Sequence, residues 1–197
     1  MRLIVASHNS HKVEEMSSIL RSRGLGVELT SLQELGDEED IIEDGTTLEA
    51  NALIKAREVL RRYHADCFSD DTGLEVRALG GAPGVYSARY AGEEHDAKKN
   101  MEKLLQEMEG VEDRRARFRT VIALICQGEE HLFEGIVEGE ILLAPSGSEG
   151  FGYDPIFRPI GSDVSFAEMR PNEKNSISHR ARALEALASF LEQRSLT

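Results

Sequence analysis

The segment Arg117–Cys126 (RFRTVIALIC) constrains the fold more strongly than any other part of this chain. It begins with alternating polar residues and continues as an unbroken apolar run, which is typical of a long strand that becomes buried on both faces. Gly128–Glu130 predicts a hairpin turn, and His131–Glu140 predicts the returning strand. Four apolar side chains of the returning strand are expected to face inward: Leu132, Phe133, Ile136 and Val137. The fold is therefore expected to be built around a sheet.

Strand and helix patterns also alternate outside this hairpin. Apolar residues at helical spacing predict helices at Val13–Arg23, Leu48–Tyr63, Lys98–Met108 and Ala181–Gln193. Short apolar runs predict strands at Leu3–Ala6, Val27–Leu29 and Cys67–Ser69. Because a hairpin occurs together with strand–helix units, we predict an α/β fold with a mixed, twisted central sheet flanked by helices. The length of 197 residues suits a single domain, 1–197, or two closely joined lobes.

Charge and composition exclude several classes of protein. The net charge of −13 argues against a nucleic-acid partner, which requires a basic face to neutralise phosphates. No apolar run reaches the length of a membrane span or a signal peptide, so we expect a cytoplasmic protein with no membrane partner. Cys67 and Cys126 lie in apolar runs without metal-ligand spacing, and we expect them to be buried thiols.

Asp70 and Asp71 follow the apolar run Cys67–Ser69 directly and precede a Thr-Gly pair. Carboxylates at the end of a buried strand lie at a rim, where a metal or a phosphate-bearing ligand can reach them. The alternative is an Asx-type turn with two solvated carboxylates, and the local pattern alone favours that alternative. The other polar segments decide between the two interpretations.

Two further segments are candidates for contact with an anion or a metal. The turn Ser7–Lys12 lies between a predicted strand and a predicted helix, where free backbone N–H groups attract anions. A simply capped helix explains that turn equally well. Glu43 lies just before Thr47, which can cap the helix that carries Asn51 and Lys55 on one face. An exposed polar stripe is at least as good an interpretation of that face.

The C-terminal third contains an aromatic loop and a cluster of cations. Phe151 is flanked by glycines and followed by Tyr153 and Asp154, an arrangement that can present a ring to a planar ligand. A loop folded back onto the core explains the same residues. Lys174, His179 and Arg180 gather around the N-terminus of the last predicted helix, where cations oppose the helix dipole unless an anion or an electron-rich base is bound.

Together these segments fit a nucleoside triphosphate bound through Mg²⁺, with Glu43 and Asp71 as the natural carboxylate pair. The sequence resembles the inosine/xanthosine triphosphate pyrophosphatase family. The resemblance rests on five blocks that keep the family's order from end to end: SHNSHKVEE, EDGTTLEANALIKA, SDDTGLEVRALGGAPGVYSARYAG, GFGYDPIF and KNSISHRARAL. It implies two lobes with an active-site cleft between them, a homodimer, and hydrolysis of ITP, dITP and XTP to the monophosphate and pyrophosphate. Such an enzyme keeps deaminated purines out of DNA and RNA.

The resemblance also implies a role for each matching residue. Asp71 would be the general base, Glu43 and Asp71 would hold Mg²⁺, and Asp70 would support the metal through water. The triphosphate would contact a set of polar residues: Ser7, His8, Asn9, Ser10, His11, Lys12, Lys55 and Thr72. Phe151 would stack on the base, Gly152, Tyr153 and Asp154 would line its pocket, and Lys174, His179 and Arg180 would read its 6-keto oxygen.

Three positions depart from the family pattern: His8 replaces Gly, Leu48 replaces Phe, and Ala50 replaces Glu. The loss of a carboxylate at Ala50 leaves Glu43 and Asp71 in place. Two other functions remain open. One is a phosphatase with an aspartyl nucleophile, although the Asp-x-Asp spacing of such sites is absent. The other is a purine sensor without turnover, although it would not need so much negative charge beside a triphosphate.

Overall fold

The computed structural model describes residues 1–195, apart from the side chains of His11 and Ser195. The chain divides into two compact units. Unit 1 contains Met1–Asp71, Thr120–Gly135 and the chain from Arg180 onward, and unit 2 contains Thr72–Arg119 and Ile136–His179. That residues 1–197 act as one catalytic domain stays a prediction.

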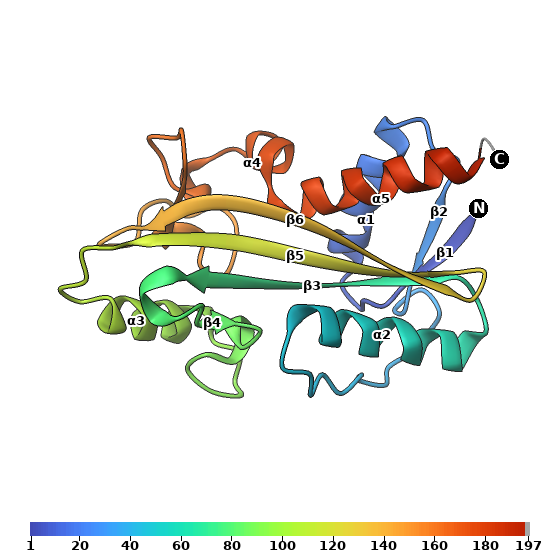
Figure 1. Ribbon diagram of the computed structural model, residues 1–197, viewed down its shortest axis with the longest axis horizontal. Coiled ribbons are helices and arrows are strands. Elements are labelled where there is room, and N and C mark those ends of the chain that lie inside the picture. Colours follow the sequence, from blue (N-terminus) through green and yellow to red (C-terminus); the bar gives the residue numbers. More distant parts are fainter. Residues whose placement is uncertain (196–197) are drawn as a thin grey trace. The chain divides into compact units, whose positions relative to one another are not determined.

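The secondary structure is mixed, as the sequence predicts (Figure 1). The strands are β1 (Arg2–Val5), β2 (Glu28–Ser31), β3 (Cys67–Val76), β4 (Pro83–Gly84), β5 (Arg115–Cys126), β6 (Glu129–Ile141) and β7 (Phe157–Pro159). The helices are α1 (Ser10–Ser22), α2 (Leu48–Tyr63), α3 (Ala97–Glu107), α4 (Pro171–Ile177) and α5 (His179–Ser195). Within residues 1–195 no helix is both long and apolar enough to cross a membrane.

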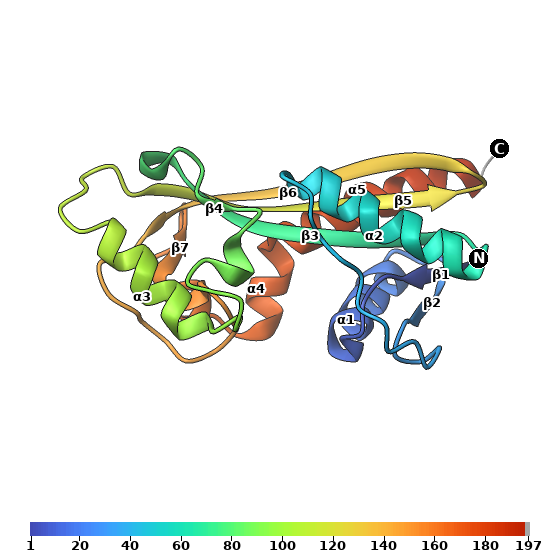
Figure 2. The same ribbon diagram turned by 90° about the horizontal axis from the view of Figure 1, so that it is seen from below.

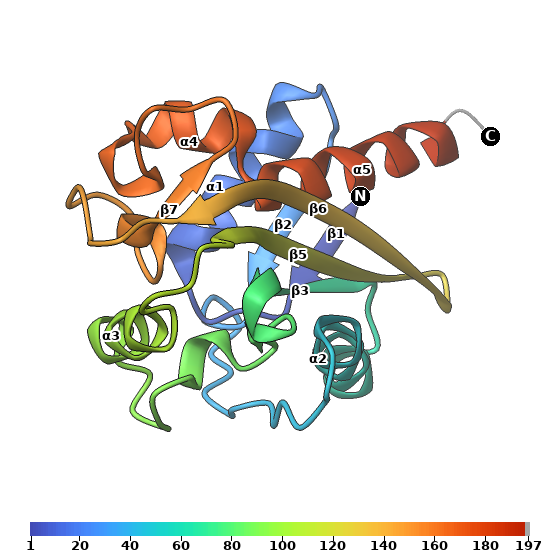
Figure 3. The same ribbon diagram turned by 60° about the vertical axis from the view of Figure 1, so that its left-hand side comes forward.

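Unit 1 is a sheet covered by helices on both faces. Its strands are ordered β2-β1-β3-β5-β6, and β1 runs parallel to both β2 and β3. Apolar residues of α1 and α5, such as Met16 and Leu187, form a core with Phe68 of β3. On the other face, the Cys67 thiol donates to the carbonyl of Ala56 in α2. Figure 2 shows α1 beside β1 and β2, and Figure 3 shows α2 and α5 on opposite sides of the strands.

Unit 2 contains the remaining parts of β3, β5 and β6 together with two short antiparallel strands. β4 pairs with β3 through Leu74 and Gly84, and β7 pairs with β6 through Gly139 and Pro159. Glycine is required at position 139, where β6 pairs with β7, because a side chain there would overlap the ring of Phe157. The core of the unit combines aromatic residues with apolar residues of α3, and its members include Leu74, Leu104, Met108, Phe118, Phe157 and Phe166.

Most predicted elements are confirmed, and the differences have physical causes. The structure confirms the bounds of α2, the β5–β6 hairpin and the buried thiols of Cys67 and Cys126. The predicted start of α1 at Val13 is wrong: the helix starts at Ser10, because the Asn9 side chain caps it by accepting from the backbone N–H of Lys12. Leu132 is 48% exposed rather than inward, and α4 was not predicted.

Candidate active site

The Asp70–Asp71 pair lies inside β3, so its predicted position at the end of a strand is wrong. Pairing with β1 reaches Phe68 and pairing with β4 involves Leu74, which leaves the carboxylates between these two contacts. The Lys55 ammonium contacts the backbone here, donating to the carbonyl of Asp70 at 2.8 Å. Successive side chains of a strand point to opposite faces, so the two carboxylates enter different surroundings.

Asp70 points to the face covered by α1 and α5 and is 2% exposed. Lys12 Nζ of α1 lies 2.6 Å from its Oδ1, and Arg180 Nε of α5 lies 3.6 Å from its Oδ2. Arg180 also lies 3.8 Å from Glu15. Burial alone would raise the pKa of Asp70, but Lys12, Arg180 and Lys55 together lower it to about 2. Asp70 is therefore an anion that holds two cations in place.

Asp71 points to the face covered by α2. Lys55 Nζ lies 3.0 Å from Glu43 Oε2 and 3.8 Å from Asp71 Oδ1, so one ammonium group bridges two carboxylates. Burial raises the pKa of Asp71 to about 6; Lys55 opposes this rise, and the nearby charges of Glu43 and Asp70 add to it. A carboxyl group with such a pKa accepts a proton readily near neutral pH, as a general base must.

Asn51 fixes the positions of Glu43 and Asp71 relative to each other. Its buried side chain accepts a hydrogen bond from the backbone N–H of Gly45 at 2.8 Å, and it also hydrogen-bonds to the Asp71 carboxylate. Gly45 has no room for a side chain, since a Cβ there would lie 2.6 Å from Asn51 Oδ1. The sequence predicts Asn51 on the same face of α2 as Lys55, but it does not predict the contact between Asn51 and Gly45.

The oxygen donors of Glu43 and Asp71 fit a small divalent cation. Lys55 lies between them and demonstrates that the pair attracts positive charge. Mg²⁺ uses one or two carboxylates together with waters and phosphate oxygens. Among the side chains described, no group of three or more His, Cys, Asp or Glu residues is placed to hold a metal ion. Two carboxylates match the number of protein oxygen ligands that Mg²⁺ uses.

The turn before α1 is exposed and polar. His8, Asn9 and Ser10 are exposed, and the Ser7 hydroxyl accepts from the backbone N–H of Asn9 at 3.1 Å. The side-chain oxygen Oδ1 of Asn9 caps α1 by accepting from the backbone N–H of Lys12, so this atom supports the turn. The side chain of His11, also predicted to contact substrate, lies outside the described part of the chain.

In unit 2 the aromatic loop is organised around Asp154. The Asp154 carboxylate accepts from the backbone N–H of Phe151 at 2.9 Å and lies 2.5 Å from Lys174 Nζ. Lys174 Nζ lies 4.7 Å from the centroid of the Phe151 ring, which is 64% exposed. A side chain at Gly150 would overlap the Asp154 carboxylate, and Gly152 adopts a φ of 61°, so both glycines are needed for this loop.

The other residues predicted in unit 2 lie on or beside its aromatic core. The His179 ring stacks on Phe118 with centroids 4.8 Å apart. The Tyr153 hydroxyl donates to the carbonyl of Ser87 at 2.7 Å, so this end of the side chain is used for structure. Thr72 continues β3 directly after Asp71. The structure thus places the predicted residues from Ser7 to Asp71 and Arg180 in unit 1, and those from Thr72 to His179 in unit 2.

Comparison with known proteins identifies the family. The model of the Ham1 family matches residues 3–190. The chain belongs to the Ham1 family. The family match confirms the resemblance found in the sequence. Curated relatives that are about 50% identical to this chain are named dITP/XTP pyrophosphatase. The relative from Christiangramia forsetii is 51% identical over 193 residues, which are 98% of this chain and 100% of that protein. The relative from Porphyromonas gingivalis is 52% identical over 191 residues, which are 96% and 97% of the two proteins.

Solved structures of Ham1 proteins are similar along the whole chain. A HAM1 protein from Coxiella burnetii has a TM-score of 0.91 at 39% identity, covering 98% of this chain and 99% of that one. The dITP/XTP pyrophosphatase from Mycobacterium abscessus has a TM-score of 0.80 at 45% identity, covering 95% and 97%. The mixed α/β fold expected from the sequence is therefore the fold of this family.

Proposed function

We propose that this Ham1-family chain hydrolyses the non-standard purine nucleoside triphosphates dITP, ITP and XTP to the monophosphate and pyrophosphate. The observation that carries the proposal is the Asp71 carboxyl group, held beside Glu43 and Lys55 with a pKa raised to about 6. The names of the relatives support the substrate class. By removing deaminated purines, such an enzyme would keep them out of DNA and RNA.

In the proposed reaction a water molecule attacks the α-phosphorus. Asp71 takes the proton of that water, the bond between the α-phosphorus and the bridging oxygen breaks, and pyrophosphate leaves. Asn51 holds the Asp71 carboxylate toward the water. Glu43 and Asp71 would hold Mg²⁺, which when bound neutralises phosphate charge and polarises the phosphoryl group.

The charged residues of unit 1 are proposed to bind the triphosphate. Lys12, held by Asp70, presents an ammonium group beside the exposed Ser7–Ser10 turn. Lys55 adds a second cation next to Glu43. Phosphate oxygens accept hydrogen bonds from such groups, and the paired carboxylates keep the cations in position.

The aromatic residues of unit 2 are proposed to bind the purine. The exposed Phe151 ring offers a stacking surface, and Lys174 and Asp154 offer a donor and an acceptor for the base edge. That His179 and Arg180 read the 6-keto oxygen stays a prediction. A donor that pairs with that oxygen meets an amino group on adenine, and an unpaired buried donor is costly enough to discriminate strongly.

We also propose that the protein requires Mg²⁺, forms a homodimer and is located in the cytoplasm. Mg²⁺ dependence, a homodimer and a cytoplasmic location rest on the family resemblance and on the composition of the chain. A substrate panel tests the central claim: dITP, XTP, dATP and dGTP with and without Mg²⁺, with pyrophosphate and orthophosphate measured separately. We expect pyrophosphate and monophosphate in equal amounts from dITP and XTP, with Mg²⁺ required and dATP a poor substrate.

Each alternative function gives a different result in this panel. Orthophosphate as the first product would indicate a phosphatase. Saturable binding of dITP without release of either product would indicate a sensor. Equal rates for dITP and dATP would remove the proposed selectivity while leaving the hydrolysis intact.

A further inference from the structure

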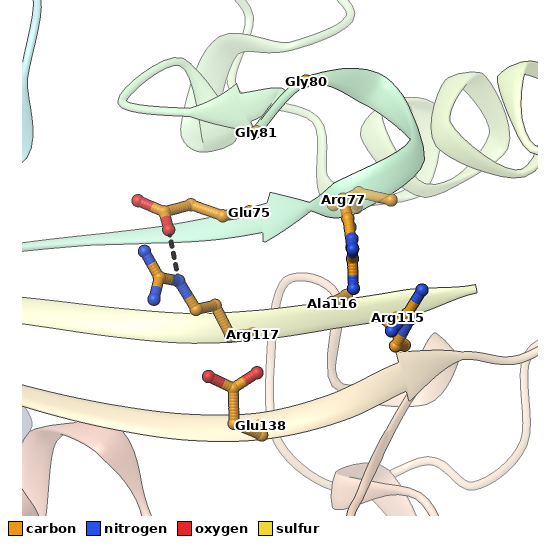
Figure 4. Close-up of a pocket in the computed structure, with 9 residues that line it drawn as sticks. Glu75, Arg77, Gly80, Gly81, Arg115, Ala116, Arg117 and Glu138 are labelled. Carbon is orange, nitrogen blue, oxygen red and sulfur yellow. Dashed lines mark hydrogen bonds and ion pairs between the residues drawn. The ribbon is translucent and has the colours of Figure 1, made fainter. Parts of the chain in front are cut away.

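A cavity of about 410 Å³ lies in unit 2, and none of the residues that line it is predicted to bind substrate or metal (Figure 4). It is bounded by β3, β5, β6 and the loop that contains Gly80 and Gly81. Its charged lining consists of three arginines and two glutamates: Arg77, Arg115, Arg117, Glu75 and Glu138. The three arginines outnumber the two glutamates, so the lining is net positive in a chain whose net charge is −13.

The three arginines differ in how far their hydrogen-bond donors are occupied. Arg115 donates to Asp113 from both Nε and Nη2 at 2.8 Å. Arg117 Nε donates to Glu75 at 2.6 Å. Arg77 Nε lies 3.8 Å from the same Asp113, which is too far for a hydrogen bond. Because Arg115 already holds both oxygens of Asp113, Arg77 is the cation best able to turn its donors to a ligand.

The glutamates make the cavity unsuitable for a ligand that carries only negative charge. Glu75 is held by Arg117, whereas Glu138 is an exposed residue of β6 whose side chain rises toward Arg117 in Figure 4. A simple dianion near Arg77 would approach these carboxylates and be repelled. A ligand with a cationic group as well as an anionic one would satisfy both kinds of side chain.

We propose that this cavity binds a small phosphorylated metabolite that also carries an amino group, with Arg77 on the phosphate and Glu138 on the amine. The planar guanidinium fork matches a phosphate group, and an ammonium group pairs with a carboxylate. The volume is in the lower part of the range of small-molecule sites, which suits a ligand the size of a sugar phosphate. The site is independent of the proposed hydrolysis, since none of its residues takes part in that reaction.

A matched pair of probes tests the proposal on the wild-type protein without turnover. Glucosamine 6-phosphate and glucose 6-phosphate differ by one amino group, and each is titrated while the arginine Nε–Hε resonances are followed by NMR. We expect saturable shifts at Arg77, Arg115 and Arg117, with glucosamine 6-phosphate binding about threefold more tightly because an exposed ion pair contributes up to about 1 kcal/mol. No saturable shift with either probe would overturn the site, and equal affinities would overturn the role of the amine.

Three variants assign the interactions. Arg77→Gln should weaken both probes at least about tenfold, because it removes a charge-assisted hydrogen bond to the phosphate. Glu138→Gln should abolish the preference for the amine and leave glucose 6-phosphate binding unchanged. Arg2→Gln, at an arginine of unit 1 whose side chain is 83% exposed, is the matched control and should change neither affinity. All three should keep wild-type dITP hydrolysis, which separates loss of this site from misfolding; unchanged probe binding in Arg77→Gln would contradict the assignment.

Discussion

Asp70 and Asp71 are neighbours on one strand, yet their carboxyl groups behave in opposite ways. The pKa of Asp70 is lowered to about 2 and that of Asp71 is raised to about 6. Burial disfavours the charge on both. The difference comes from the two faces of β3: cations from α1 and α5 contact Asp70, whereas Asp71 shares the single ammonium group of Lys55 with Glu43.

This comparison separates a structural carboxylate from a reactive one. Asp70 is already neutralised by Lys12 and Arg180, so it has little tendency to take up a proton near neutral pH. Asp71 and Glu43 carry more negative charge than Lys55 can neutralise, which favours either a proton or a metal cation. Alternation along a strand is enough to give two adjacent, identical side chains these different chemical roles.

The largest expected effect is on turnover. Asp71→Asn keeps the size of the side chain but removes the proton acceptor and a metal-binding oxygen, so kcat with dITP should fall at least about 10³-fold. The rate of pyrophosphate release at saturating Mg²⁺ measures the loss. Asp44→Asn, at an exposed carboxylate next to Glu43, is the matched control and should keep a near wild-type rate. An Asp71→Asn variant with a rate close to the wild type would remove Asp71 from the role of base.

The second prediction concerns the free energy of unfolding. Asp70→Asn leaves Lys12 and Arg180 without their anion in a buried position, so the protein should lose about 3 kcal/mol of stability. Asp71→Asn should lose none, since it removes a carboxylate that burial and Glu43 disfavour. Urea unfolding of the two variants at about pH 7.5 in EDTA measures both values. Equal losses would mean that the two faces of β3 do not differ as the structure indicates.

The sequence predicted the fold largely because its elements are marked by local patterns. Thr47 caps α2 as expected, and the apolar run of β5 is buried as its composition requires. The course of β3 was not predictable in this way, because two adjacent aspartates and a Thr-Gly pair are typical of a turn. Contacts from distant segments override that preference: the Lys55 ammonium binds the carbonyl of Asp70, and Lys12 binds its carboxylate.

The residues of the candidate site could be predicted from the sequence. Their distribution between the two faces of β3 could not. Residue types suggest Glu43 and Asp71, the family resemblance adds Lys55, and the structure brings these three together. The sequence groups Arg180 with Lys174 because both lie near one helix start, yet the ion pairs of Arg180 are with Asp70 and Glu15. Which face of a helix or strand a residue occupies depends on long-range packing, and a local pattern does not contain that information.

The third prediction tests how the Asp71 face is held together. Asn51→Ala removes the acceptor of the Gly45 N–H and the hydrogen bond to Asp71, which should lower stability by about 2 kcal/mol. The activity with dITP should fall as well, since Glu43 and Asp71 lose their common support. Asn51→Asp keeps the acceptor for Gly45 but adds a carboxylate beside Asp71, so it should restore part of the stability only at acidic pH. Full stability of Asn51→Ala would show that the Glu43 loop is fixed by other contacts.

The smallest expected effect is a difference in pH dependence between Asp71→Asn and the wild type. The folded pKa of Asp71, about 6, lies above its unfolded value, so its contribution to stability is complete below the unfolded pKa and is lost as the pH rises through 6. The stability of Asp71→Asn relative to the wild type should therefore increase by about 1–2 kcal/mol between roughly pH 4 and pH 7. Asp70 has the opposite sign, because its stabilising charge is lost only as the pH falls through about 2. Urea unfolding in EDTA across this range isolates Asp71, and a constant difference would place its pKa near the ordinary value and remove the contrast between the two carboxylates.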